Sequence, residues 1–191
     1  MPSPLPDAEL LLDRERTSRR DGSGLRAEQL LGTWVLAQTW PRRAGQPAAL
    51  SSALLRVLGA RLILAAATAP LAPLRITNRV QLGALELSFQ GQAWLEGRRP
   101  LLIFRFEQLQ LRLGDWLWLD RPLAGPPAST GPGQRHGALP FFALIATETL
   151  AGDASGSGPG SEPPGRWLAA RGRGGGLALW LQAPDQPIAR V

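Results

Sequence analysis

The chain of 191 residues has no cysteine, no tyrosine and no lysine, and its only histidine is His136. Without cysteine there can be no disulfide, no iron–sulfur cluster and no cysteine-ligated zinc. One histidine is too few for a histidine-based metal site, and the absence of lysine removes Schiff-base chemistry and the Walker phosphate-binding motif. We therefore expect no metal site and no cofactor chemistry of these kinds.

Long hydrophobic runs are also missing. The best run, Leu62 to Leu74, is interrupted by Pro70 and Pro73 and is too short to cross a bilayer. The first residues lack the apolar segment of a signal peptide, and their five acidic side chains argue against an organelle transit peptide. The sequence predicts a cytoplasmic protein that is at most peripheral to a membrane.

The charge is positive and uneven. All 21 basic residues are arginine against 15 acids, so the net charge is +6, with −1 on residues 1–24 and +7 on the remainder. A basic body of this kind is attracted to anionic surfaces such as phospholipid headgroups or nucleic acid. Arginines scattered over a solvated surface would give the same net charge. The charge therefore does not decide between binding to an anionic surface and simple solvation.

Composition divides the chain into a charged leader and one larger body. Residues 1–24 form the leader, in which Asp7 to Arg20 predicts a short, solvated helix. The body spans 25–183, and 184–191 is a tail. Within the body, 124–137 and 152–165 are rich in Gly, Pro and Ser and are expected to be mobile loops.

The body contains mostly strand-like segments. The clearest is Leu85 to Leu95, in which apolar residues alternate with polar ones, and Leu101 to Leu113 follows as its hairpin partner. The apolar parity of this partner shifts near Glu107–Gln108, which predicts a β-bulge. The remaining elements are a short turn of helix at Leu25–Leu31, a helix at Ala48–Gly59, and apolar segments at Thr33–Trp40, Arg61–Ala67, Leu74–Leu82, Leu139–Leu150, Arg166–Arg171 and Leu177–Gln182. Arg61–Ala67 is compatible with either helix or strand. We predict an all-β fold, a lipocalin-like antiparallel β-barrel of about eight strands with one or two short helices.

Catalytic constellations are sparse. His136 lies in a Gly/Pro-rich loop that supplies neither a fixed partner nor the burial that tunes a general base. Glu86 and Glu96 fall on the solvated face of their strand, where carboxylates commonly serve solubility. The segment Arg171 to Gly175 resembles an RGG element, but a single copy between two strands is typical of a glycine-rich turn. We expect no catalytic residues and no enzyme.

A possible closure of the barrel involves Gly32, Trp34 and Arg171. Gly32-Thr33-Trp34 opens the first strand, and Arg171 ends a late one. In small barrels a tryptophan can seal the base while an arginine stacks on it by a cation–π contact. We expect Trp34 and Arg171 to be in contact.

Four stretches, in this order and spacing, resemble the plastid lipid-associated protein family, also called fibrillins. They are Leu30 to Leu36, Ile76 to Val80, Leu95 to Glu107 and Leu168 to Leu177. The chain departs from the family's pattern in two places. Gln38-Thr39-Trp40 stands where the family has Tyr-Thr-Ser, and the segment that usually precedes the last motif in the family is missing. The resemblance extends over about Leu25 to Leu181. Over this length the chain resembles a divergent, cyanobacterial member of the family.

The resemblance implies a barrel that binds a hydrophobic small molecule, a carotenoid, quinone or other prenyl lipid, without catalysis. It also implies peripheral association with thylakoid membranes or plastoglobules, and the basic body and the Leu50–Leu58 segment could contact anionic lipids there. The strand parity supplies candidate ligand-binding residues: Trp34, Leu85, Leu87, Phe89, Leu102, Phe104 and Phe106.

Three other functions remain open from the sequence. The first is a scaffold or assembly factor with a filled barrel that binds a protein partner, because lining a cavity and filling a core give the same apolar pattern. The second is a lyase that attaches bilin chromophores. The third is a nucleic-acid-binding protein, which we do not expect because the tryptophans Trp34, Trp167 and Trp180 lie inside apolar strands.

Overall fold

The computed structural model describes residues 5–41, 60–67, 74–124, 139–150 and 165–184. It contains the helix α1 (Ala8–Asp21), the 3₁₀ helix η1 (Ala27–Leu30) and nine strands. The strands are β1 (Gly32–Trp40), β2 (Arg61–Ala66), β3 (Leu74–Leu82), β4 (Leu85–Glu96), β5 (Leu101–Leu113), β6 (Trp116–Pro122), β7 (Phe141–Thr149), β8 (Arg166–Gly172) and β9 (Leu177–Gln182).

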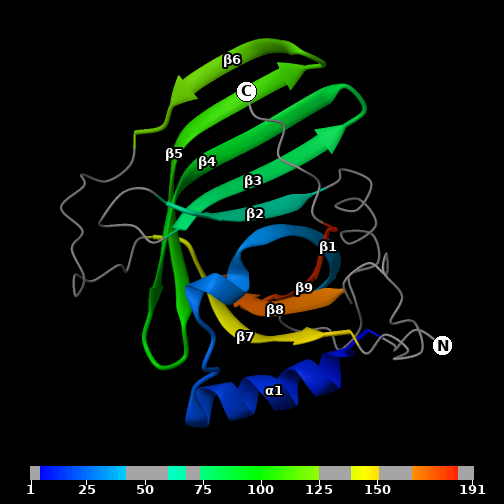
Figure 1. The fold of residues 1–191 in the computed structure, drawn as a ribbon, viewed down its shortest axis with the longest axis vertical. Helices are drawn as coiled ribbons and strands as arrows, with labels where there is room; N and C mark the ends of the chain where they lie inside the picture. Colours follow the sequence, from blue (N-terminus) through cyan, green and yellow to red (C-terminus); the bar gives the residue numbers. More distant parts are fainter. Residues whose placement is uncertain (1–4, 42–59, 68–73, 125–138, 151–164, 185–191) are drawn as a thin grey trace, which may run out of the picture.

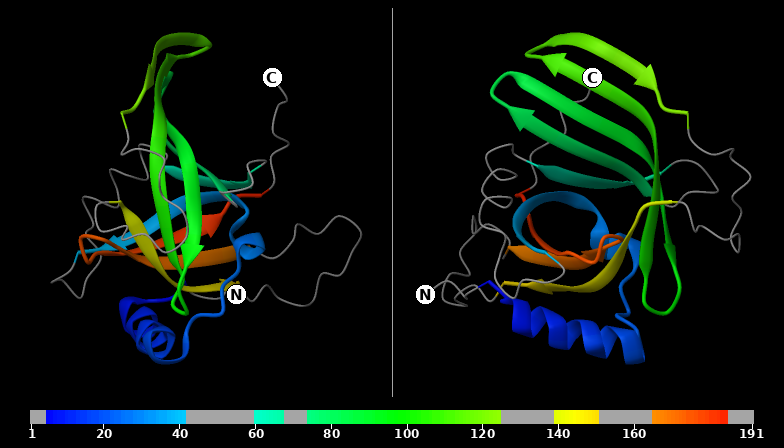
Figure 2. Two further views of the ribbon diagram at one scale, coloured as in Figure 1. Left: turned by 90° about the vertical axis from the view of Figure 1, so that its left-hand side faces the viewer. Right: turned by 180° about the vertical axis from the view of Figure 1, so that it is seen from behind.

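The nine strands form one antiparallel sheet in the order β4-β3-β2-β1-β9-β8-β7-β5-β6. Because β4 also pairs with β5, eight of these strands close in a ring, and β6 lies outside it at the sheet's end. Figures 1 and 2 show this barrel-like arrangement, with α1 against its lower side. The predicted antiparallel all-β class is confirmed, and Arg61–Ala66 is a strand.

Strand β6 was not predicted. Its apolar residues are consecutive, Trp116-Leu117-Trp118-Leu119, so they give no alternating pattern with one buried face. In the structure all seven residues of β6 are exposed, and the strand is held by pairing with β5 alone among the described strands. Backbone pairing with a long neighbour, rather than burial, therefore determines this strand.

The bulge predicted near Glu107–Gln108 is confirmed. On β4, Gln90 pairs with Gln108 and the next residue, Gly91, pairs with Phe106, so Glu107 is the extra residue. A Cβ atom at Gly91 would lie 1.9 Å from the Arg105 carbonyl oxygen and 2.8 Å from the Phe106 Cα. The bulge brings the β5 backbone so close to β4 that only glycine fits opposite it.

Two hydrophobic cores lie on opposite faces of the sheet. The inner core fills part of the ring and includes Trp34, Leu102 and Leu168. The outer core includes Trp40, Trp167 and Leu11 of α1. Strand alternation explains how one β8 strand serves both cores, because Trp167 and Leu168 are neighbours that point to opposite faces.

The predicted leader helix exists, but its expected exposure was wrong. Asp7 caps α1 by accepting a hydrogen bond from the Leu10 N–H at 2.9 Å. Leu11, Glu15 and Ser18 recur at helical spacing and are buried against the outside of the ring. The Ser18 hydroxyl donates to the Leu144 carbonyl of β7 at 3.4 Å. Residues of the leader therefore complete the outer core of the body.

Parts of β3, β4 and β5 extend beyond the ring together with β6, and we call residues 80–89 and 109–122 the arm. Strand β2 pairs with β3 only as far as Arg79, and β7 pairs with β5 only as far as Ile103. The arm is the four-stranded upper part of Figure 1, at the end of the molecule opposite α1. It places a large part of the sheet outside the closed ring.

Several expectations lie outside the described residues: the helix at Ala48–Gly59, His136, most of the loops 124–137 and 152–165, and nearly all of the tail 184–191. Within the described part of the chain, no helix has the length and apolar character needed to cross a membrane.

Candidate functional site

An open apolar cavity of about 300 Å³ lies inside the ring. It opens between the inner faces of β1, β2, β3, β5, β7 and β9. Its apolar lining residues are Leu36, Ala60, Leu62, Ile76, Val80, Phe104, Phe106, Phe142, Ala178 and Trp180. The volume is at the lower end of the range for small-molecule pockets, about 300–1,000 Å³.

Three polar residues also line the cavity: Thr39, Arg61 and Asn78. Arg61 alternates with the inner residues Ala60 and Leu62, so it borders the cavity while its side chain belongs to the outer face. Arg61 and Asn78 come from the neighbouring strands β2 and β3, where Arg61 pairs with Arg79 and Leu62 with Asn78. A mostly apolar pocket with a few polar groups is typical of sites that orient a hydrophobic ligand by one polar end. The cavity therefore has the chemistry to hold a molecule that is largely apolar and carries a hydrogen-bonding group.

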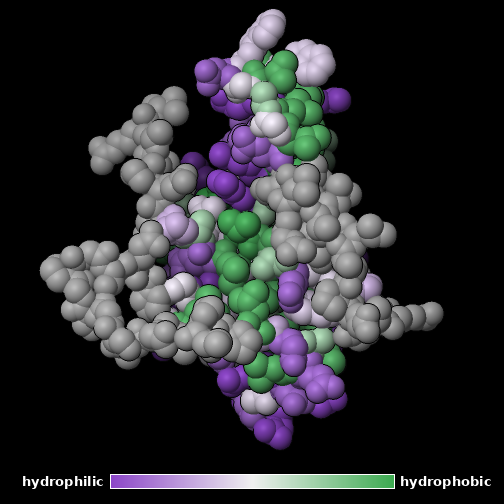
Figure 3. Space-filling model, turned by 90° about the vertical axis from the view of Figure 1, so that its right-hand side faces the viewer, coloured by the Kyte–Doolittle hydropathy of each residue, from purple (hydrophilic) through white to green (hydrophobic). Residues whose placement is uncertain are grey.

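Aromatic rings form a continuous path from the cavity to the arm. Ring centroids lie 5.4 Å apart between Phe142 and Trp180, 5.2 Å between Phe104 and Phe142, and 5.3 Å between Phe104 and Phe106. Phe89 of the arm lies 5.5 Å from Phe106. Figure 3 shows hydrophobic residues in the middle of the molecule and again at its upper end.

The candidate ligand residues fall into three groups. Phe104 and Phe106 line the cavity, as predicted. Trp34 and Leu102 are fully buried in the inner core and do not line it. Leu85, Leu87 and Phe89 belong to the arm, where Leu85 is exposed. Strand parity identified the correct inner face of β4 and β5, but it does not show where along a strand the ring ends.

Sequence reasoning missed Phe142, Trp180 and Ile76 as lining residues. Trp180 could have been found from the alternation in β9, where Ala178 and Trp180 share a face, but its place beside Phe142 depends on which strands close the ring. No local pattern marks that closure.

The expected contact of Trp34 with Arg171 is corrected by the structure. The guanidinium over the Trp34 ring belongs to Arg166, at 5.7 Å from the ring centroid, and the indole N–H donates to the Leu30 carbonyl at 2.8 Å. Arg166 and Arg171 lie at opposite ends of β8, about 17 Å apart along a strand of this length. They also differ in parity, so one shares the inner face with Leu168 and the other the outer face with Trp167. Gly32 does have a backbone of φ +125° that disfavours any side chain.

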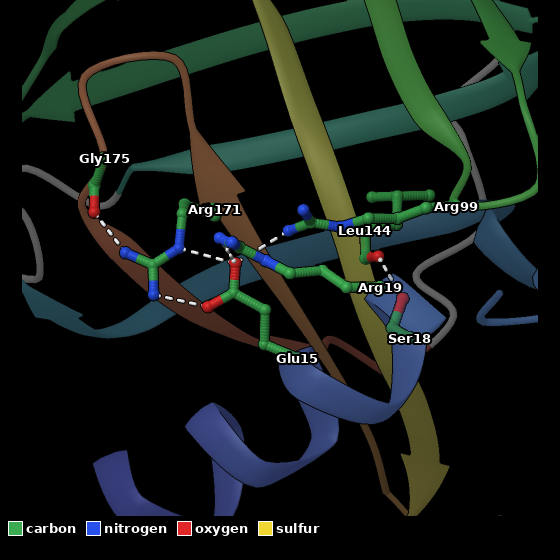
Figure 4. A network of polar contacts seen from close by, with 7 residues as sticks. All are labelled: Glu15, Ser18, Arg19, Arg99, Leu144, Arg171 and Gly175. Carbon is green, nitrogen blue, oxygen red and sulfur yellow. Dashed lines mark hydrogen bonds and ion pairs between the residues drawn. The ribbon is translucent and has the colours of Figure 1, made fainter. Parts of the chain in front are cut away.

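Arg171 instead belongs to an ionic network with Glu15 of α1 (Figure 4). The Arg171 Nε and Nη2 atoms donate to the two carboxylate oxygens of Glu15, the first at 2.7 Å. Arg99 donates to Glu15 at 2.7 Å and Arg19 at 2.9 Å, so three guanidinium groups surround one buried carboxylate. Arg171 also donates to the Gly175 carbonyl, which ties the β8–β9 turn into the network.

The network controls the protonation of Glu15. Burial by itself would raise the pKa of this carboxyl, but the hydrogen bonds and charges of Arg171 and Arg19 outweigh it and lower the pKa to about 2. Glu15 is therefore a permanent anion at physiological pH that attaches α1 to the turn at the end of the ring. The arrangement joins α1, the β4–β5 turn and the end of β8.

The described residues contain no cluster of three or more His, Asp or Glu side chains that could hold a metal ion. Glu86 is ion-paired with Arg79 at 3.4 Å.

The fold and the site together define a barrel-like antiparallel protein with an apolar cavity. Comparison of the chain with family models, with curated proteins and with solved structures finds no match.

Proposed function

We propose that this protein binds a hydrophobic small molecule, a quinone, carotenoid or other prenyl lipid, in the cavity of the ring and does not act as an enzyme. The observation that supports the proposal most is the cavity of about 300 Å³, whose wall is apolar except for Thr39, Arg61 and Asn78. Burying an apolar ligand there is favourable by about 25 cal/mol per Å² removed from water.

The polar residues favour a ligand with one polar end. The Asn78 side-chain amide shares the inner face of β3 with Ile76 and Val80 and offers both a donor and an acceptor. A quinone carbonyl or a lipid headgroup oxygen could accept from the Asn78 amide, whereas a pure hydrocarbon could not. We therefore expect a quinone or an oxygenated prenyl lipid to bind more tightly than an unsubstituted carotene.

The cavity is too small for a long prenyl lipid in its whole length, since drug-sized ligands already need 300–1,000 Å³. The row of rings from Trp180 through Phe104 and Phe106 to Phe89 leads out of the ring onto the arm. We infer that the polar end of the ligand enters the cavity and that its chain continues along the apolar face of the arm.

The resemblance of four stretches to the plastid lipid-associated family agrees with this class of ligand. It also suggests a location at the surface of thylakoid membranes or plastoglobules, where such molecules are stored and exchanged.

The test is to purify the full chain from a host that contains carotenoids and quinones, extract it with organic solvent, and identify the bound molecules by absorbance and mass spectrometry. Ala178 lines the cavity, so Ala178→Phe should fill part of it and abolish stoichiometric binding. Ala66→Phe adds the same side chain at an exposed position of β2 and should leave binding unchanged.

A protein that carries no lipid and takes none up when titrated with ubiquinone or a xanthophyll would refute the proposal. That result would favour the scaffold with a filled ring, and the next step would be to identify its protein partner. Equal ligand retention by Ala178→Phe and Ala66→Phe would show that binding occurs outside the cavity.

A further inference from the structure

The outer end of the arm exposes an unusual concentration of large apolar side chains. Trp116 and Trp118 are 75% and 72% exposed, and Leu82, Leu85, Leu113, Leu117 and Leu119 are between 37% and 55% exposed. Taking about 200 Å² for each indole side chain, the two tryptophans alone present about 300 Å². Together with the leucines they exceed the apolar patch of a typical monomer.

Most of this apolar surface lies on one side of the arm. On one side, Trp116 lies opposite Leu113 and Leu119 opposite Leu111. Leu117 lies opposite Arg112 and so points to the other side, and Trp118 is the extra residue of a bulge. A protein partner or a second copy seated on the first side would leave Leu117 uncovered, whereas a fluid apolar medium covers both sides.

Charges at the arm favour a lipid surface. Arg112 and Arg121 balance Asp115 and Asp120 in number, and Glu86 is paired with Arg79, so insertion carries little net charge into lipid. The whole chain has a net charge of +6, which attracts it to anionic headgroups. Tryptophan itself prefers the boundary between headgroups and acyl chains.

The backbone limits the depth of insertion. Among the described strands β6 pairs only with β5, so its outer row of N–H and C=O groups needs water or headgroups as partners. Asp115 at the β5–β6 turn has the same requirement. Both features are compatible with the interfacial layer of a membrane and not with its hydrocarbon centre.

We propose that the outer end of the arm, centred on Trp116 and Trp118, docks the protein on an anionic lipid surface. The apolar face of the arm then connects that surface with the ring cavity. The docking itself stands on the exposed residues of the arm; its role in ligand transfer rests on the proposed function.

The test measures binding of the full chain to phosphatidylcholine vesicles with and without phosphatidylglycerol, by flotation. The wild type should bind the anionic vesicles more tightly. Replacing both indoles, Trp116→Ser with Trp118→Ser, should weaken that binding more than about tenfold. Leu82→Ser with Leu85→Ser, at the neighbouring turn of the arm, should weaken it in the same direction.

The matched control replaces two leucines that are exposed elsewhere, Leu10→Ser with Leu12→Ser on α1. It should bind vesicles like the wild type. Thermal melts establish that all variants are folded, which is expected because the replaced side chains are exposed. Brominated lipids should quench wild-type fluorescence, and the part of the quenching due to Trp116 and Trp118 should be lost in the double variant.

Three outcomes would overturn the docking proposal: no binding of the wild type to either vesicle, equal binding by the double tryptophan variant, or an equal loss in the α1 control. A different result would assign the arm to self-association instead. In that case the wild type would sediment as a dimer, the two tryptophan substitutions would make it a monomer, and no variant would bind vesicles. Ligand retention separates the two proposals. The double tryptophan variant changes no cavity residue, so the polar end of the ligand should still enter the cavity, whereas Ala178→Phe should lose the ligand but still bind vesicles.

Discussion

At the scale of single residues, Glu15 shows how one side chain can join two parts of a fold. Its carboxylate is buried and accepts hydrogen bonds from Arg171, Arg99 and Arg19. Removing one member of a buried ionic group leaves the others without compensation, which costs more than the group itself contributes. The leader helix, the β4–β5 turn and the end of β8 all meet at this carboxylate.

Glu15→Gln should lower the free energy of unfolding at neutral pH and flatten its dependence on acid. The folded pKa of about 2 lies below the ordinary value of 4.5, so the stabilisation is complete above about pH 4.5 and is lost as the pH falls towards 2. The difference corresponds to about 3 kcal/mol. Urea unfolding across this pH range measures it, with Glu9→Gln, an exposed position of the same helix, as control. A parallel acid dependence in wild type and Glu15→Gln would contradict the assignment.

Gly91→Ala should destabilise the protein by at least about 3 kcal/mol, because the new methyl group would overlap the backbone of Arg105 and Phe106. Gly174→Ala, where an added Cβ meets nothing within 4 Å, should change stability by less than about 0.5 kcal/mol. Chemical denaturation of the two variants provides the comparison. If Gly91→Ala were as stable as Gly174→Ala, β4 and β5 could not approach as closely as the bulge requires.

At the scale of elements, α1 is a structural part of the molecule. Its buried stripe of Leu11, Glu15 and Ser18 completes the outer core, which the sheet alone would leave exposed. Arg14 adds an ion pair with Glu148 of β7 at 2.8 Å, although both partners are well exposed and the pair contributes little.

Leu11→Ala should therefore destabilise the whole protein by about 2–5 kcal/mol, as expected for a fully buried leucine. Leu12→Ala, an exposed neighbour on the same helix, should cost less than about 1 kcal/mol. The free energies come from denaturant titration followed by tryptophan fluorescence, which reports on Trp40 and Trp167 of the outer core. Equal effects of the two substitutions would mean that α1 does not pack on the ring.

At the scale of the whole molecule, the sheet has two parts with different surroundings, the closed ring and the arm. The ring buries a core and leaves a cavity at one end, and the arm continues the same apolar face into the surroundings. A sheet of this size can expose apolar area without losing stability because the ring alone supplies the inner core. Ligand binding and lipid docking, as proposed, then use two separate parts of one surface.

Much of this fold could be predicted from the sequence because strands with one buried face alternate. The segment Leu74–Leu82 is a strand over its predicted length, and the parity shift in Leu101–Leu113 located the bulge at Glu107. Where alternation was absent, prediction failed: the consecutive apolar residues of β6 have no buried face to mark them.

The sequence by itself determined the strands that alternate, the β4–β5 hairpin with its bulge, the inner faces of β4 and β5, and the absence of any site that needs cysteine or lysine. Only the tertiary structure decided that β1 pairs with β9 and β5 with β7 to close the ring, that Arg166 and not Arg171 covers Trp34, and that Glu15 is buried. The reason is physical. Alternation is a property of a single strand and is present in the residue order, whereas ring closure, ion-pair choice and helix docking depend on which distant surfaces meet.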